Sequence, residues 1–98
     1  MAQLNSASDL PAGRQVSAKV KMYYVYVLNS VNFDRNYTGF TKDLDRRVRE
    51  HNLGKNKSTK AYVPWKLIHV EEFEERLEAR KREKYLKSGS GREYLKKL

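Results

Sequence analysis

Short runs of apolar and β-branched residues along the chain mark three predicted strands. The runs YYVYVL at 23–28 and NYTGF at 36–40 are separated by a polar connection of hairpin length, which predicts an antiparallel hairpin. A third strand is predicted for WKLIHVEEF at 65–73. Gly39 lies inside the second run, and a glycine within a strand often marks the close approach of another backbone or of a ligand.

A helix is predicted directly after the second strand. Thr41 is its expected N-cap, and Gly54 lies just past its expected end. Leu44 and Val48, four residues apart, form its apolar stripe.

Two more helices are predicted after the third strand. Residues 74–89, EERLEARKREKYLKSG, predict a strongly charged helix that Gly89 closes. A short final helix within residues 90–98 would turn three side chains inward, namely Tyr94, Leu95 and Leu98. The order β-β-α-β-α-α predicts an α+β domain, in which a small three-stranded antiparallel sheet is flanked by helices.

The first 21 residues differ in character from the rest of the chain. They show no apolar period and are rich in Ser, Ala, Gln and Gly, so we expect residues 1–21 to be a disordered leader or tag. Met22 directly precedes the first predicted strand, and residues 22–98 are long enough for one compact core. Removing residues 1–21 is therefore expected to leave the melting temperature nearly unchanged.

The chain is strongly basic, with 21 Lys and Arg residues against 12 Asp and Glu residues and a net charge of +9. The positive electrostatic field of such a protein favours binding to polyanions. Nucleic acid is the first expected partner, and an anionic membrane surface is the second. No apolar run approaches the ~18 residues of a membrane-spanning helix, and no secretory signal is recognisable. The absence of cysteine excludes disulfides and thiolate sites and suits a reducing compartment. We therefore expect a cytoplasmic protein, with association with the nucleoid left open, and no membrane partner.

Several side chains could serve phosphodiester hydrolysis. Arg47 and His51 are four residues apart and project from one edge of the first helix, while the hairpin carries Tyr26 and Tyr37. Glu83 lies on the charged helix. One carboxylate can hold a divalent cation, and an arginine can stabilise the charge of the transition state. A phenol or an imidazole can take a proton from the attacking water.

Two of these residues, Glu83 and His51, also have a purely structural explanation. From its position alone, Glu83 is better explained by ion pairs with Arg80 or Lys87 on a solvated surface. His51, near the end of a helix, is a favourable partner of the helix dipole. The catalytic interpretation depends on the combination of these residues with the net positive charge.

The order of these motifs resembles the GIY-YIG nuclease domain, and most closely its small, standalone bacterial branch. The residues that carry the resemblance are YVY at 24–26, YTG at 37–39, Arg47, His51 and Glu83. Further blocks that look alike are STK, PWKL, EEF, EARKREKYLKSG and GREYLKK. The resemblance covers residues 22–98 and implies the same fold as the residue pattern does.

The resemblance also implies a role for each matched residue. Tyr26 would activate the attacking water, and Tyr37 would position water or phosphate, although relatives leave open which tyrosine is the base. Arg47 would stabilise the scissile phosphate, and His51 would assist proton transfer. Glu83 would be the only carboxylate that binds the metal, a single Mg²⁺ or Mn²⁺ ion.

Some positions match the family and others depart from it. Gly39 matches the glycine of the second motif, whereas Tyr24 and Thr38 replace a glycine and an isoleucine of the two motifs. No asparagine follows Glu83, although many relatives have one near the site. Phe40 stands where relatives often carry a lysine that would lower the pKa of a nearby phenol.

The sequence therefore predicts a metal-dependent endonuclease that hydrolyses phosphodiester bonds in DNA, in preference to RNA, with little sequence specificity. Four lysines are expected to contact phosphates and to make binding salt-dependent, namely Lys55, Lys57, Lys60 and Lys66. The departures from the family pattern support an alternative hypothesis, in which the protein is a nucleic-acid-binding module with the nuclease fold but weak or no catalysis. A third hypothesis is an adaptor whose basic face binds an acidic protein, although no particular protein partner follows from the sequence.

Overall fold

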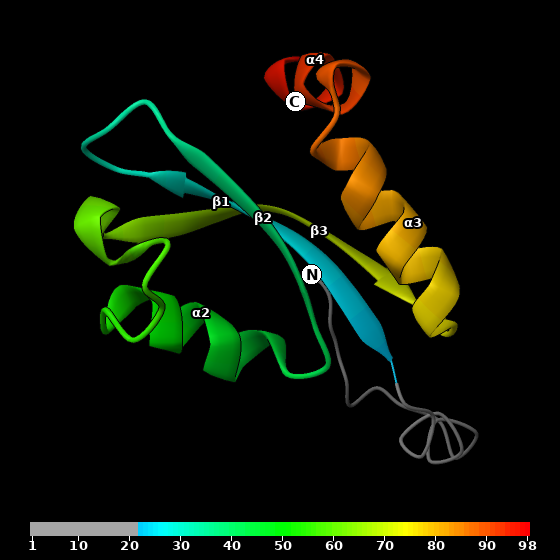
Figure 1. Cartoon of the computed structure of the whole chain (residues 1–98), viewed down its shortest axis with the longest axis horizontal. Helices are drawn as coiled ribbons and strands as arrows, with labels where there is room; N and C mark the ends of the chain where they lie inside the picture. The colour runs from blue at the N-terminus through cyan, green and yellow to red at the C-terminus, as the bar shows by residue number, and fades with distance from the viewer. Residues whose placement is uncertain (1–21) are drawn as a thin grey trace, which may run out of the picture.

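The computed structural model of the protein describes residues 22–98 (Figure 1). The expected leader at 1–21 lies outside the described residues. The elements, in chain order, are β1 (Tyr23–Ser30), β2 (Asn36–Thr41), α2 (Leu44–Asn52), the 3₁₀ turn η1 (Lys60–Tyr62), β3 (Trp65–Phe73), α3 (Arg76–Leu86) and α4 (Gly89–Lys96). The predicted α+β class and the order β-β-α-β-α-α are confirmed.

The three strands form one antiparallel sheet in the order β2-β1-β3. The central strand β1 contains four successive residues that are almost fully buried, Val25, Tyr26, Val27 and Leu28. A strand covered on both faces reads as a continuous apolar run, which is why YYVYVL shows no alternation with polar residues. β1 therefore contributes buried side chains to the core on both faces of the sheet.

Each face of the sheet has its own apolar cluster. On one face, Val25 and Val27 pack against Ala79 and Leu86 of α3 and Leu95 of α4. On the other face the cluster is built on Tyr26, Leu28 and Trp65, with Leu44 and Val48 of α2 packed against it. Figure 1 shows α2 on one side of the sheet and the pair α3 and α4 on the other. The predicted apolar stripe of the first helix is thus confirmed.

The predicted N-cap of the first helix was wrong by two residues. Asp43 caps α2, because its Oδ1 accepts a hydrogen bond from the backbone N–H of Arg46 at 3.2 Å. Thr41 instead ends β2, where it pairs with Tyr24. Its hydroxyl accepts a hydrogen bond from the Asp43 N–H at 3.1 Å, which stabilises the turn into the helix.

The predicted end of the charged helix was also wrong. α3 stops at Leu86, and Gly89 begins α4 rather than closing α3. Ser88 has an extended backbone and caps α4 by accepting a hydrogen bond from the Gly91 N–H at 3.2 Å. A Cβ at Gly91 would lie 2.8 Å from the carbonyl carbon of Leu86, so glycine lets the two helices cross closely.

Of the three side chains predicted to face inward from the final helix, only Leu95 is buried. Leu98 is 62% exposed because it lies beyond the end of α4. Tyr94 is partly exposed and packs its ring edge-on against His69 of β3, with centroids 5.9 Å apart. No helix within residues 22–98 combines the length and the apolar composition needed to cross a membrane.

Candidate active site

Tyr26 lies on β1 directly opposite Gly39 of β2 in the antiparallel register. Its side chain is almost completely buried and crosses over the glycine. A Cβ at position 39 would lie 2.5 Å from the Cζ atom of the Tyr26 ring. Gly39 therefore makes the space that the phenol occupies, which gives the glycine of YTG a steric function.

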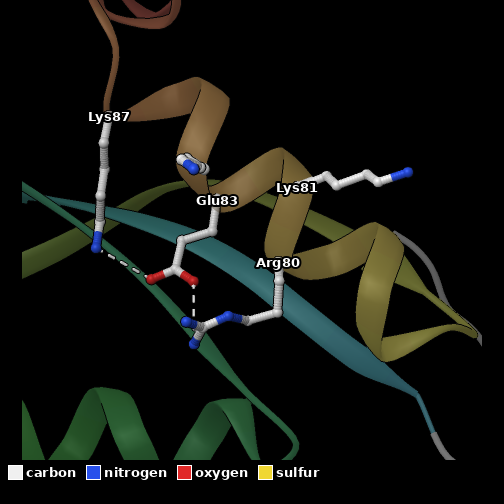
Figure 2. A pocket seen from close by; sticks show the side chains of 5 residues that line it. Arg80, Lys81, Glu83 and Lys87 are labelled. Carbon is white, nitrogen blue, oxygen red and sulfur yellow. Dashed lines mark hydrogen bonds and ion pairs between the residues drawn. The ribbon is translucent and has the colours of Figure 1, made fainter.

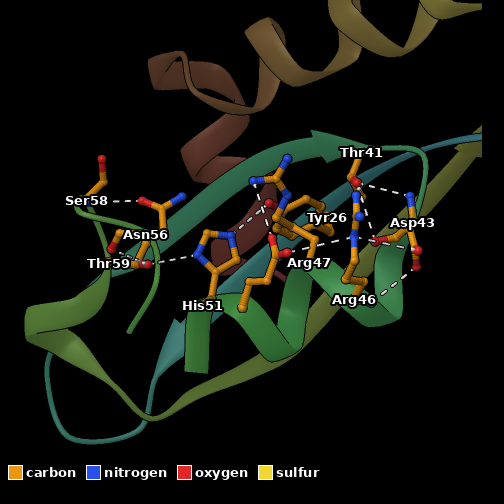
Figure 3. Close-up of polar contacts among 10 residues, drawn as sticks. Tyr26, Thr41, Asp43, Arg46, Arg47, His51, Asn56, Ser58 and Thr59 are labelled. Atoms are coloured by element: carbon orange, nitrogen blue, oxygen red, sulfur yellow. Dashed lines mark hydrogen bonds and ion pairs between the residues drawn. The ribbon is translucent and has the colours of Figure 1, made fainter. Parts of the chain in front are cut away.

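His51 lies in the last turn of α2 and is fully buried beside Tyr26. The Tyr26 hydroxyl and the His51 Nε2 atom are 2.9 Å apart, within hydrogen-bond distance (Figure 3). The Tyr37 ring completes the group, with its centroid 4.8 Å from that of His51 and 6.2 Å from that of Tyr26. Three elements thus bring two phenols and an imidazole together.

Thr59, in the loop after α2, completes this hydrogen-bond chain and was missed from the sequence. Its Oγ1 atom is 2.8 Å from the His51 Nδ1 atom and 3.4 Å from the carbonyl oxygen of Asn56 (Figure 3). A carbonyl can only accept, so the Thr59 hydroxyl donates to Asn56 and accepts from Nδ1–H of His51. The Nε2 atom of His51 then accepts the proton of the Tyr26 hydroxyl.

Thr59 is itself held rigidly. Only 1% of its surface is exposed, and its carbonyl oxygen accepts a hydrogen bond from Nε1 of Trp65 at 3.0 Å. The one sequence signal that could have indicated this role is its place in the STK block. A hydroxyl eight residues from a histidine, across a loop, has no periodic relation to it.

The titration of Tyr26 and His51 follows from their burial. Burial raises the pKa of Tyr26 well above 10.0, and Tyr37 adds to the increase, whereas the positive charge of Arg47 opposes it. Burial lowers the pKa of His51 below 6.5, and Arg47 lowers it further. At neutral pH the phenol is therefore protonated and the imidazole is neutral, as the hydrogen-bond chain requires.

Arg47 reaches this group from the same edge of α2 as His51 (Figure 3). Its Nε atom is buried and has no hydrogen-bond partner among residues 22–98, while the side chain as a whole is 39% exposed. The contact with Glu50 is long, at 3.9 Å. The partly exposed end of the guanidinium, which has only this long ion pair, is therefore available to an anion that approaches from solvent.

Glu83 projects from α3 and is mostly buried, with 13% of its side chain exposed. Its Oε2 lies 3.1 Å from Nζ of Lys87, and its Oε1 lies 3.7 Å from a guanidinium nitrogen of Arg80 (Figure 2). Both ion pairs of the structural explanation are thus present. The negative charge of Glu83 also adds to the raised pKa of Tyr26, so the carboxylate lies within electrostatic range of the phenol.

A family model described as the GIY-YIG catalytic domain matches residues 22–97. The chain belongs to this family. It is 43% identical over 67 residues to a UPF0213 protein of Haloquadratum walsbyi, covering 67% of this chain and 74% of the relative. It is 46% identical over 67 residues to a UPF0213 protein of Listeria welshimeri, covering 67% and 73% respectively.

A solved structure of the same kind supports the fold. The solution NMR structure of a UPF0213 protein from Bacillus halodurans is 35% identical and aligns with a TM-score of 0.50, covering 79% of this chain and 84% of that one. The family resemblance expected from the YVY and YTG motifs is therefore confirmed. The matched region contains Tyr26, Tyr37, Arg47, His51 and Glu83.

A GIY-YIG metal site would have to be built on Glu83. Residues 22–98 contain no group of three or more His, Cys, Asp or Glu residues that could hold a metal ion. Glu83 borders a hollow of about 430 Å³ and offers the oxygen donors that a hard divalent cation prefers. The carboxylate of Glu83 can bind one such ion when water and phosphate supply the other ligands and when Lys87 or Arg80 moves away from the carboxylate oxygens.

The lysines predicted to contact phosphates are all exposed. Lys55, Lys57 and Lys60 follow α2, and Lys66 lies on β3. The basic residues that line the hollow beside Glu83 in this GIY-YIG domain are others, namely Arg80, Lys81, Lys84 and Lys87 of α3 and its C-cap. The role of the four predicted lysines stays a prediction.

Proposed function

We propose that the protein is a divalent-metal-dependent endonuclease that hydrolyses phosphodiester bonds in DNA with little sequence specificity. The observation that carries the proposal is the 2.9 Å hydrogen bond between Tyr26 and His51, with the charges of Arg47 and Glu83 within electrostatic range of Tyr26. Membership of the GIY-YIG catalytic domain family supports it. The net charge of +9 favours a polyanionic substrate, and the expected location is the cytoplasm.

Tyr26 and His51 would act together as the base. Because burial raises the pKa of Tyr26, a free phenolate is disfavoured at neutral pH. As the attacking water gives a proton to the Tyr26 oxygen, the phenol passes its own proton to Nε2 of His51. The hydrogen bond from Nδ1 to Thr59 keeps the imidazole in the tautomer that can accept it.

Arg47 and Glu83 would bind the reacting phosphate from two sides. The Arg47 side chain is 39% exposed and its contact with Glu50 is long, at 3.9 Å, and a guanidinium is suited to two phosphate oxygens at once. Glu83 would hold one Mg²⁺ or Mn²⁺ ion, and a cation there would neutralise charge that develops on the phosphate and the leaving oxygen. Arg80 and Lys87, displaced from Glu83, would then lie beside the bound phosphate.

The proposal is tested by incubating the purified protein with plasmid DNA and with single-stranded DNA in Mg²⁺ or Mn²⁺. We expect cleavage by the wild type and a loss of about 10²- to 10⁴-fold in rate for Tyr26→Phe, which removes the hydroxyl. Glu83→Ala should abolish the dependence on metal together with cleavage.

Matched controls are Tyr85→Phe and Glu78→Ala, which change the same residue types at exposed positions of α3. Both should cleave DNA like the wild type. Cleavage that survives in Tyr26→Phe and Glu83→Ala alike would contradict the proposal. The same assay with RNA tests the preference for DNA.

A second candidate function is a nucleic-acid-binding module with little or no catalysis. It is favoured by the ion pairs that occupy both oxygens of Glu83, because a metal ion must compete with Arg80 and Lys87 for the carboxylate. Salt-dependent DNA binding without cleavage in any divalent metal would establish this alternative.

A further inference from the structure

A second hollow, of about 400 Å³, lies between the β1–β2 turn and α4. Asn29, Asn36 and Thr38 line it from the two strands. Arg92 and Lys96 line it from α4, where their spacing of four residues places them on one side of the helix. The hollow thus combines polar strand side chains with two cations.

Lys87 lines both this hollow and the one beside Glu83. The two hollows are therefore neighbours, joined at the junction of α3 and α4. Among residues 22–98, their linings together contain seven cations and only two carboxylates, which are Glu83 and Asp34. A continuous basic surface of this kind attracts a chain of phosphates rather than a single anion.

We propose that this second hollow binds the DNA backbone next to the bond that is cut, so that the bound strand runs from Glu83 past Lys87 to Arg92 and Lys96. This inference rests on the proposed function, because that function places the reacting phosphate beside Glu83. The hollow supplies the substrate contacts that a small domain needs to hold a strand in register over its site.

The chemistry of the lining suits a sugar–phosphate backbone. The Nδ2 group of Asn29 donates to Oδ1 of Asn36 at 2.8 Å, which leaves the amide NH₂ of Asn36 available as a donor. Asparagine, arginine and lysine are all common ligands of DNA phosphates. The guanidinium of Arg92 takes part in none of the ion pairs found between residues 22–98.

The ion pair of Lys96 does not compete strongly with DNA. Lys96 and Glu93 are 3.4 Å apart, but both side chains are largely exposed. Exposed pairs of this kind contribute little, because solvent screens them and two flexible side chains must be ordered. Lys96 can therefore exchange this partner for a phosphate.

The test measures DNA affinity by fluorescence anisotropy in EDTA, with the full chain and over a range of salt concentrations. Arg92→Gln and Lys96→Gln should each weaken binding several-fold and reduce the slope of log affinity against log salt by about 0.9. Lys97→Gln is the matched control, since it removes the adjacent charge of the same exposed helix end without touching either hollow. Its slope should remain that of the wild type. All three positions are exposed, and equal melting temperatures would show that the fold is kept.

Two outcomes would overturn the inference. One is DNA binding that neither Arg92→Gln nor Lys96→Gln changes. The other is an equal loss in Lys96→Gln and Lys97→Gln, which would mean that net charge alone binds DNA. Because EDTA prevents metal-dependent turnover, DNA binding is measured separately from cleavage. Binding through Arg92 and Lys96 by a protein that never cuts DNA would refute the proposed function, while the hollow would still be a binding site for the DNA backbone.

Discussion

Thr59 lies outside the matched catalytic motifs, yet its hydroxyl determines which nitrogen of His51 carries the proton. The bond of 2.8 Å to Nδ1 leaves Nε2 as an acceptor for the Tyr26 hydroxyl. Thr59 would touch neither phosphate nor water, so we regard it as a positioning residue. Its effect on chemistry would pass entirely through the imidazole.

Thr59→Val keeps the shape of the side chain and removes the hydroxyl. We expect it to lower kcat for DNA cleavage while leaving DNA affinity unchanged, because it disturbs only the proton acceptor. The unpaired, buried Nδ1–H should also cost about 1–3 kcal/mol of stability. Nitrogen chemical shifts of His51 would report the tautomer.

Thr59→Ser is the matched control, since it restores the hydroxyl and should recover the tautomer and kcat. Ser58→Ala, at the exposed neighbouring position, should have no effect. A Thr59→Val variant with wild-type kcat and unchanged His51 shifts would contradict the positioning role.

Gly39→Ala tests the space under the Tyr26 ring. Its Cβ would lie 2.5 Å from Cζ of Tyr26, so the ring must move and the hydrogen bond to His51 must lengthen or break. We expect a loss of about 1–3 kcal/mol in the free energy of unfolding from overpacking, together with a loss of cleavage. Gly89→Ala is the control, because a Cβ there meets nothing within 4 Å. Equal melting temperatures for the two variants would contradict this interpretation.

At the scale of elements, the position of α3 determines where Glu83 points. Arg82, the residue before Glu83, donates from Nε to both oxygens of Glu71 on β3, at 2.9 and 3.1 Å. Its guanidinium also packs over the rings of Tyr85 and Tyr94. These contacts join β3, α3 and α4 and restrict rotation of α3 about its axis.

Burial by itself raises the pKa of Glu71, but hydrogen bonds from Arg82 and His69 outweigh it and hold the pKa below 4.5. Glu71→Gln removes the charge and should lower the free energy of unfolding by about 1 kcal/mol at neutral pH, since the pair is partly solvated. The folded-state pKa is depressed, so this stabilisation is complete above pH 4.5 and is lost as the pH falls through the folded pKa.

Urea unfolding at several pH values measures this difference. The wild type and Glu71→Gln should approach equal stability at acidic pH. Glu72→Gln, at the exposed next position of β3, is the control and should differ little from the wild type. A difference between the wild type and Glu71→Gln that grows as the pH falls would show that the sign of the pKa shift is wrong.

At the scale of the whole molecule, the positive charge is spread over more than one surface. The loop after α2 carries Lys55, Lys57 and Lys60, while the two joined hollows lie along α3 and α4. Charges that do not touch the bound DNA can still speed its approach, because their field acts over roughly 10 Å at moderate salt. The loop and the joined hollows can therefore differ in how they affect the rates of DNA association and dissociation.

A double variant, Lys55→Gln with Lys57→Gln, tests the loop. We expect a slower association with DNA and a weaker salt dependence of that rate, with little change in dissociation, as is typical of charges at the rim of an interface. Stopped-flow fluorescence between about 50 and about 200 mM salt measures this effect. An unchanged association rate would show that the loop lysines do not steer DNA to the protein.

The sequence by itself determined the strands, the order of the elements and the family. The β-branched and aromatic run of β1 and the apolar stripe of Leu44 and Val48 are local residue patterns, so they predict a strand and a helix without knowledge of the fold. The motif order from Tyr26 to Glu83 is likewise a property of the chain. Helix ends were less predictable, because Asp43 and Ser88 were selected as caps by the path of the backbone.

Only the tertiary structure decided which side chains touch. The bond between Tyr26 and His51 joins a strand to a helix 25 residues away, and Thr59 reaches His51 from a loop. The ion pairs of Glu83 with Arg80 and Lys87 are different, because spacing along one helix predicted them. Contacts between different elements follow from how those elements face one another when they pack, and the spacing of residues along the chain does not reveal them.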